Sequence, residues 1–148
     1  MAQPRLILTR RIAAPRSAVY RAWTDSEIMR SWLGPDNFEC TENTGEVRVG
    51  GPWHSVIRDR ATGELHPSSG TYREVVPDRK LAFTFRWDGS DELETVCTVE
   101  FTDDDGATLM TFTQEPFADD ASRDGHAGGW SEAFGKLERV ASEAAATN

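Results

Sequence analysis

Apolar and polar residues alternate along most of the chain, and this alternation predicts a sheet. Residues 5–12 predict a first strand, in which Arg10 interrupts an otherwise apolar side. Turn signals then divide residues 38–117 into six further strands. These signals are Asn43-Thr44-Gly45, Gly50-Gly51-Pro52, Ala61-Thr62-Gly63, Pro77-Asp78, Asp88-Gly89 and 103–106. The pattern therefore predicts a seven-stranded antiparallel meander.

The two sides of these strands differ in character, because side chains alternate across a strand. One side gathers Trp53, Ser55, Ile57, Gly70, Tyr72, Leu81, Phe83, Phe85, Trp87, Met110 and Phe112. The other side carries His54, Arg58, Thr71, Arg73, Thr84, Arg86, Thr111 and Thr113. We expect one dry, aromatic face and one solvated face.

Two short helices are expected between the first and second strands. Pro15 suits the first position of a helix, where its missing N–H is not needed. Thr24 and Glu27 have the spacing of a capping box, which would start a second helix. The segment Leu33-Gly34-Pro35 would end it.

The last segment, 126–146, has the period of a long amphipathic helix. Its apolar stripe consists of Trp130, Phe134, Leu137 and either Val140 or Ala141. Its start would be capped by Asp119, Asp120 or Ser122. The dry face of the sheet must meet this stripe, so the sheet has to curve around the helix. A strongly bent sheet and one helix rarely fill the space between them, and we expect an apolar cavity there.

The order of these elements and five sequence segments resemble the START-like helix-grip superfamily, also called SRPBCC. Within it, the chain resembles the branch named after the activator of the heat-shock protein 90 ATPase. The segments are TRRIAAPRSAVYRAWTDSEIMRSWLGP (9–35), GGPWHSVIRD (50–59), GTYREVVPDRKLAFTFRWDG (70–89), TVEF (98–101) and HAGGWSEAFGKL (126–137). The resemblance implies one α+β domain over residues 1–148, with a seven-stranded curved antiparallel sheet around a long C-terminal helix and two short helices after the first strand.

Composition narrows the choice of partners. The formal net charge is −9, and no basic face is visible that would meet nucleic acid or an anionic membrane. No apolar segment approaches the roughly 20 residues that cross a bilayer, and the N-terminus lacks the order of a signal peptide. A cytoplasmic protein is expected. Cys40 and Cys97 are far apart in sequence and are expected to be unpaired thiols.

Large, mostly aromatic residues of the dry face, the second short helix and the long helix are the candidates for lining a ligand cavity. They are Trp32, Trp53, Tyr72, Phe83, Phe85, Trp87, Met110, Phe112, His126, Trp130 and Phe134, while Trp23 is expected to be plain core. Each of them has filling of the core as its alternative role. No catalytic motif, metal site or cofactor site stands out.

The start of the long helix combines two glycines with a histidine. Gly128 and Gly129 would each weaken a helix by about 1 kcal/mol relative to alanine. They would leave room for a guest or allow close backbone contact. His126 lies four residues before Trp130 and so on the same stripe. It would either bind a polar group of the guest or act as acid or base, or bond to a neighbouring carboxylate or carbonyl.

Arg10 and Glu74 are charged residues beside apolar strand positions. If both point inward, they are expected to pair with each other, or Arg10 with Glu100 or Glu115, because an unpaired interior charge is costly. Orientation of a carboxylate guest is the functional alternative.

Three functions are consistent with these patterns. The favoured one is binding of a small, mainly hydrophobic molecule, with His126 or Tyr72 fixing its polar end. The second is an enzyme resembling polyketide cyclases or dehydratases that uses the same cavity. The third is a co-chaperone-like protein of the stress response that contacts a chaperone, and a homodimer through an edge strand is a further possibility. The chain is short for the chaperone activators, which carry an additional N-terminal module.

Overall fold

The computed structural model describes residues 3–146 and confirms the expected order of elements. Strand β1 (Leu6–Ile12) leads into helices α1 (Arg16–Thr24) and α2 (Ser26–Met29). Six strands and the long helix follow: β2 (Phe38–Gly45), β3 (Pro52–Asp59), β4 (Leu65–Val76), β5 (Lys80–Trp87), β6 (Thr95–Asp104), β7 (Ala107–Glu115) and α3 (Asp120–Ala146).

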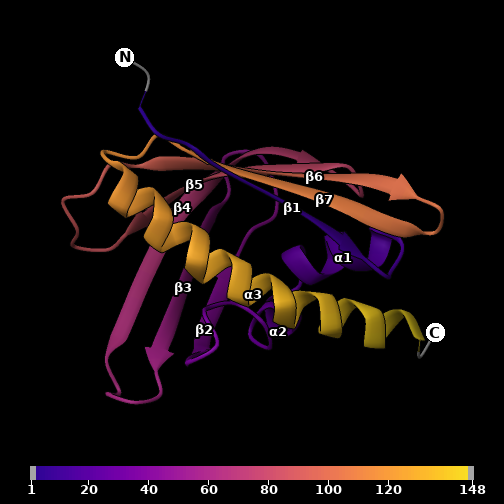
Figure 1. Cartoon of the computed structure of the whole chain (residues 1–148), viewed down its shortest axis with the longest axis horizontal. Coiled ribbons are helices and arrows are strands. Elements are labelled where there is room, and N and C mark those ends of the chain that lie inside the picture. The colour runs from indigo at the N-terminus through magenta and orange to yellow at the C-terminus, as the bar shows by residue number, and fades with distance from the viewer. Residues whose placement is uncertain (1–2, 147–148) are drawn as a thin grey trace.

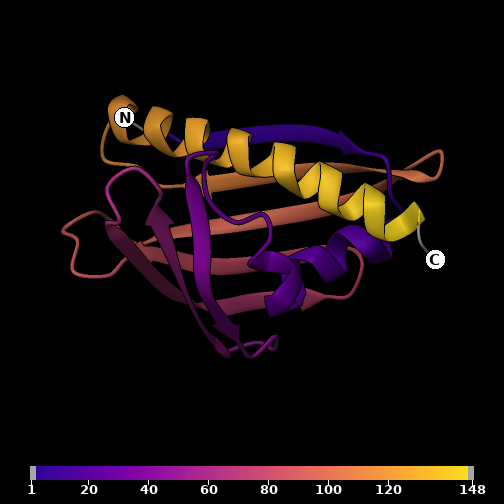
Figure 2. The same ribbon diagram turned by 90° about the horizontal axis from the view of Figure 1, so that it is seen from below.

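The strands form one antiparallel sheet in the order β1-β7-β6-β5-β4-β3-β2. Figure 1 shows how strongly it curls, since β2, β3 and β4 turn away from the plane of β1, β7 and β6. All three helices lie on the concave side, with α3 running along β1 (Figure 2). The curved sheet around a C-terminal helix is the helix-grip fold, as expected.

Helix α3 covers the sheet with the predicted stripe. Trp130, Phe134, Leu137 and Ala141 are buried, whereas Val140 is only partly buried. Of the three possible caps, Asp119 has this role, because its carboxylate accepts a hydrogen bond from the Ser122 amide at 2.8 Å. Because this stripe packs against the sheet, the opposite face of α3 points away from the core and can carry charged residues.

The predicted capping box between the short helices is wrong. Thr24 is the last residue of α1, and its hydroxyl donates to the Tyr20 carbonyl. Asp25 caps α2 instead, since its backbone is extended and its carboxylate accepts from the amides of Glu27 and Ile28. The helix ends at Met29, so Trp32 lies in the turn beyond it.

The turn predicted at Asn43-Thr44-Gly45 is also wrong, because these residues continue β2 and pair with β3. The chain reverses over residues 46–51 instead. Asn43 stays in the strand because its amide donates to the Ser55 hydroxyl at 2.6 Å across the strand pair. A residue type that favours turns is thus held in the sheet by a buried partner.

Arg10 and Glu74 do not pair with each other or with the other expected acids. Arg10 reaches α3, where it contacts the Glu138 carboxylate at 3.2 Å and the Ser131 carbonyl at 3.2 Å. Glu74 contacts Lys80 at 3.3 Å. The reason is that α3 runs along β1 and offers partners closer than those in the sheet.

The core is an aromatic cluster around Trp23. This ring lies 4.8 Å from Trp32, 5.9 Å from Phe134 and 6.1 Å from each of Phe83, Phe112 and Trp130, measured between centroids. Its indole donates to the Met110 sulfur at 3.3 Å. Trp23 therefore joins α1 to the sheet and to α3, and the expected core role is confirmed. Cys40 and Cys97 are free, as expected, and both are buried.

Gly70 allows Trp53 to cross the sheet on its concave side. The Trp53 indole passes over Gly70 and donates to the Thr84 carbonyl in β5 at 3.0 Å. A Cβ atom at Gly70 would lie 1.9 Å from that same carbonyl oxygen. Thr84, expected on the solvated face, is buried because its hydroxyl accepts from the Thr71 amide at 2.8 Å.

We predict that Gly70→Ala destabilises the fold by about 3 kcal/mol, because backbone atoms cannot yield to the added methyl group. Gly128→Ala is the control, since a Cβ there meets nothing within 4 Å. It should stabilise the protein by up to about 1 kcal/mol through helix propensity. Chemical denaturation of both variants measures the difference. Equal stabilities of the two variants would show that the backbone of β5 leaves room for a methyl group at position 70.

Candidate functional site

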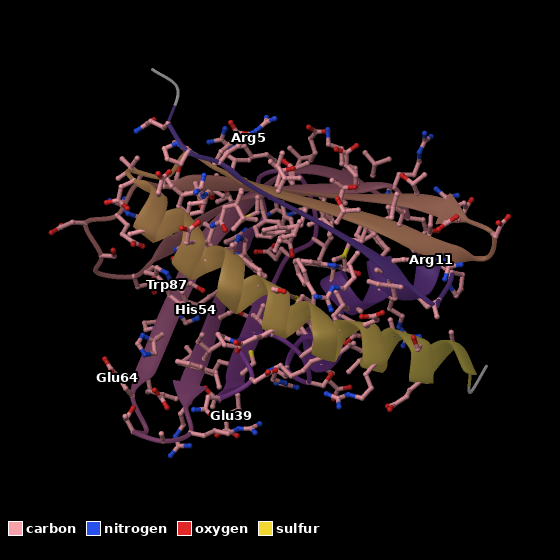
Figure 3. All side chains as sticks on the ribbon, in the orientation of Figure 1. Arg5, Arg11, Glu39, His54, Glu64 and Trp87 are labelled. Atoms are coloured by element: carbon pink, nitrogen blue, oxygen red, sulfur yellow. The ribbon has the colours of Figure 1, made fainter. Side chains whose placement is uncertain are left out.

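The main cavity, of about 260 Å³, lies between the concave face of the sheet and the first half of α3. Its sheet side is formed by Phe38, Ile57, His66, Ser68, Phe85 and Trp87. Its helix side is formed by Gly125, His126, Gly129, Trp130 and Ala133, and residues 33–35 close a third side. Trp87 is labelled in Figure 3, where it lies near the N-terminal half of α3.

The charged side chains labelled in Figure 3, Arg5, Arg11, Glu39 and Glu64, lie on the outside of the molecule. The lining of the main cavity contains no Asp, Glu, Lys or Arg among the described residues. Its polar groups are two imidazoles and one hydroxyl, from His66, His126 and Ser68. The cavity is therefore apolar with a few hydrogen-bonding groups, which is the composition of small-molecule sites.

Glycines on α3 shape the helix side of the cavity. A Cβ atom on Gly129 would meet only the Pro35 ring, at an ordinary 3.4 Å, and one on Gly125 would meet nothing within 4 Å. Gly125 and Gly128 are both exposed, but only Gly125 and Gly129 line the main cavity. Of the two expected roles, Gly129 leaves room rather than making close backbone contact. Gly128 does neither.

His126 stands in the wall between the main cavity and a second one. This loop cavity, of about 390 Å³, is bounded by the β5–β6 loop and the start of α3. The imidazole lies among the rings of Phe85, Trp87 and Phe117, with centroids 5.1–6.2 Å away. Its Nε2 is 3.7 Å from the Glu92 carboxylate. Both expected roles of His126 are therefore compatible, since it faces a carboxylate and lines a cavity.

The pKa of His126 is lowered from its ordinary value of 6.5. Burial of the imidazole is the larger cause, and the Glu92 carboxylate opposes it. The side chain is 13% exposed, so the charged form has little access to water. The imidazole is consequently neutral at neutral pH and can donate or accept a hydrogen bond.

A third, inner cavity of about 40 Å³ continues from the main cavity toward the Trp23 cluster. The two share Leu33, Ser68, Phe85 and Trp130 in their linings. The inner cavity is also lined by Asn43, Ser55, Tyr72 and Phe83, and it contains no charged side chain among the described residues. It is large enough for a water molecule or a small functional group but not for a ring.

The structure brings together seven of the eleven residues proposed to line a cavity. Trp53, Tyr72, Phe83, Phe85 and Trp130 line the inner cavity, and Phe85, Trp87, His126 and Trp130 line the main one. The other four, Trp32, Met110, Phe112 and Phe134, line none of the three cavities and are at most 1% exposed. Met110 and Phe112 of β7 lie where α1 and α3 cover the sheet, and Trp32 and Phe134 pack against Trp23 in the same core cluster.

Several residues of the cavities were not singled out from the sequence. His66 and Ser68 of β4 have the same parity as Gly70 and Tyr72, so period-two spacing could have placed them on the concave face. Gly125 lies three residues before Gly128 and is not part of the predicted glycine pair. For Leu33 and Pro35 the sequence predicts only the end of a helix.

A buried chain of hydrogen bonds fixes one wall of the site. The Trp130 indole donates to the Gln114 side-chain oxygen at 2.9 Å, and the Gln114 amide donates to the Thr95 hydroxyl at 2.8 Å. That hydroxyl donates to the Phe85 carbonyl at 3.3 Å. The chain thus joins α3 to β7, β6 and β5, and it sets the orientation of Trp130.

We predict that His126→Gln makes the melting temperature less sensitive to acid. The folded pKa of His126 is below its unfolded pKa, so its contribution to stability is present above pH 6.5 and is lost as the pH falls below that value. Thermal unfolding from about pH 7.5 to about pH 5.5 measures the loss. Equal slopes for the variant and the parent protein would contradict the assignment.

Glu92→Gln tests the same pair from the other side. Because the Glu92 carboxylate raises the His126 pKa, its removal should make the melting temperature fall more steeply as the pH decreases. The matched control is Glu94→Gln, which removes an exposed carboxylate from the same loop and should leave the slope unchanged.

Metal and membrane features were searched within residues 3–146. No three His, Cys, Asp or Glu side chains in this range gather closely enough to hold a metal ion. No helix in this range is both long and apolar enough to span a membrane.

Solved structures with this fold cover almost the whole chain. Protein CV1439 from Chromobacterium violaceum is 26% identical, with a TM-score of 0.86 over 93% of this chain and 96% of its own. The AHSA1 protein SPO3351 from Silicibacter pomeroyi is 24% identical, with a TM-score of 0.82 over 98% and 100% of the two chains. Protein NE0264 from Nitrosomonas europaea is 24% identical, with a TM-score of 0.80 over 96% of each chain.

No curated protein matches the chain. The family model described as activator of Hsp90 ATPase homolog 1-like protein matches residues 13–142. This match extends from the end of β1 to the last turns of α3 and includes every residue that lines the main cavity. The chain therefore belongs to the family of activator of Hsp90 ATPase homolog 1-like proteins.

Proposed function

We propose that this protein binds a small, mainly apolar molecule in the main cavity. The observation that carries the proposal is a space of about 260 Å³ between sheet and helix whose lining is apolar apart from His66, His126 and Ser68. An engineered apolar cavity of about 150 Å³ in another protein binds benzene. A cavity of this size can therefore take a larger guest, such as one with two fused rings.

The chemistry of the walls favours a guest with aromatic rings. Phe85, Trp87 and Trp130 present flat apolar surfaces, and His126 lies among them. Aromatic rings gain about 0.5–1.5 kcal/mol from offset or edge-to-face contact beyond the burial of their area. The few hydrogen-bonding groups would fix the orientation of the guest.

The glycines of α3 give the proposal an energetic argument. Each weakens the helix by about 1 kcal/mol relative to alanine. A Cβ atom on Gly125 would meet nothing within 4 Å and one on Gly129 only the Pro35 ring at 3.4 Å, so packing against the protein does not require glycine at either position. Space for a guest is a reason for their presence that close packing does not supply.

We predict that Gly129→Leu blocks the site. The leucine side chain would occupy the main cavity and weaken binding of a neutral apolar dye, N-phenyl-1-naphthylamine, by about tenfold or more, which corresponds to about 1.4 kcal/mol. Gly128→Leu is the matched control, because it makes the same change one residue away on the exposed side of α3. Dye fluorescence measures binding, and thermal unfolding verifies that both variants are folded.

Equal binding by the two variants would show that the dye binds elsewhere. Absence of stoichiometric dye binding by the unmodified protein, together with absence of a guest in native mass spectrometry of protein from its host, would refute the proposal.

A further inference from the structure

A row of hydrogen-bonding side chains crosses the apolar concave face of the sheet beside the two cavities. Asn43 of β2 lies opposite Ser55 of β3, and Ser55 lies opposite Ser68 of β4. Their relative exposures are 8%, 1% and 5%. Tyr72, at 7%, lies further along β4 on the same face. Four polar residues are thus gathered where the sheet is otherwise apolar.

The side chains of two of these four residues have no hydrogen-bond partner among the described residues. Asn43 and Ser55 are bonded to each other at 2.6 Å. Among the described residues, neither the Ser68 hydroxyl nor the Tyr72 hydroxyl takes part in a hydrogen bond, although both residues are more than nine-tenths buried. Every side-chain oxygen or nitrogen of the described residues that is inaccessible to water has a hydrogen-bond partner. Since these two hydroxyls have none, both must be accessible from a space large enough for water. That space is the inner cavity, which both residues line.

The two hydroxyls need a hydrogen-bond partner from outside the described chain. Buried polar groups in folded proteins are nearly always paired, and leaving one unpaired costs about 1–3 kcal/mol. Because both hydroxyls are open to the inner cavity, water can bond them there when no ligand is bound. A ligand that displaces this water therefore has to offer a hydrogen-bonding group of its own.

The electrostatics of the cavities define the partner's charge. Within the described residues, neither cavity is lined by Asp, Glu, Lys or Arg. An ionised carboxylate or amine would enter without a counter-ion, which is strongly unfavourable in an apolar site. Burial raises the pKa of Tyr72 to about 12, so its hydroxyl stays protonated and able to donate.

The two cavity sizes define how the partner lies. Ser68 lines both cavities, so it stands where they meet. The main cavity, of about 260 Å³, can take a body of fused rings, whereas the inner one, of about 40 Å³, takes only a small group. We infer that Ser68 and Tyr72, supported by Asn43 and Ser55, form a polar subsite for an uncharged hydroxyl or carbonyl group on a ring-containing ligand whose apolar body fills the main cavity. This inference rests on the proposed function and names its ligand class.

Three matched probes test the inference: naphthalene, 2-naphthol and 2-naphthoate. Equilibrium dialysis against the full chain should show 2-naphthol binding about threefold to tenfold more tightly than naphthalene, the ratio expected from one hydrogen bond. It should show 2-naphthoate binding more weakly than naphthalene, because its carboxylate finds no cation. Ser68→Ala and Tyr72→Phe should each reduce the preference for 2-naphthol without weakening the binding of naphthalene.

Ser69→Ala is the control, since the adjacent hydroxyl bonds to Asp88 on the outer side of the sheet. It should keep the full preference for 2-naphthol. If naphthalene and 2-naphthol bind equally well, or if 2-naphthoate binds most tightly, the polar subsite is refuted while apolar binding stands. If none of the probes binds, the proposed function fails together with the inference.

Stability in the absence of ligand supplies a second readout. Ser68→Ala removes a hydroxyl that has no hydrogen-bond partner among the described residues and should leave the melting temperature nearly unchanged. Ser55→Ala removes a paired one from the same row, leaves the Asn43 amide without its acceptor, and should lower it. A fall in melting temperature for Ser68→Ala as large as that for Ser55→Ala would show that Ser68 is bonded within the protein and would overturn the inference.

Discussion

The buried chain of hydrogen bonds from Trp130 through Gln114 and Thr95 to the Phe85 carbonyl is the interaction on which the site depends. Three of its members are side chains at most 9% exposed, and each has its partner. In a low-dielectric interior such a chain is strong when complete and costly when broken. It therefore fixes Trp130 of α3 relative to three strands. Since Trp130 and Phe85 both line the main and the inner cavity, the same bonds that dock the helix also hold the cavity walls.

The cavity follows from a mismatch between the sheet and its covering. Around Trp23 the rings of α1, α3, β5 and β7 pack closely, and they leave only the inner cavity of about 40 Å³ at this end of the concave face. Toward β2, β3 and β4 the sheet curls away (Figure 1), while the first turns of α3 carry Gly125 and Gly129. Aromatic packing at one end thus keeps the helix in place, and small residues at the other end keep the space open. The fold needs the first feature for stability, and only the second concerns a guest.

Periodicity predicted the seven strands, the long helix and the concave face, because period two and period 3.6 are direct consequences of backbone geometry. It did not predict which part of that face the helices cover. Phe112 and Phe85 have the same sequence signature, yet one packs beneath α1 and α3 and the other lines cavities. Predictions of local contacts were wrong for a similar reason. Thr24 and Asp25 are both good caps, and the choice between them was made by where α1 ends. Arg10 found its partner on α3, which is distant in sequence.

Polar residues on the concave face fall into two kinds that sequence alone does not distinguish. Gln114 and Thr95 occupy inward positions of their strands and are fully bonded within the protein, so they serve the fold. Ser68 and Tyr72 occupy equivalent inward positions, yet their hydroxyls face a cavity without a partner among the described residues. Parity identifies both kinds, but only a complete account of hydrogen bonds separates them. A hydroxyl that the fold does not bond, at the edge of a space that the fold does not fill, is matched better by a ligand that carries its own hydrogen-bonding group than by a purely apolar one.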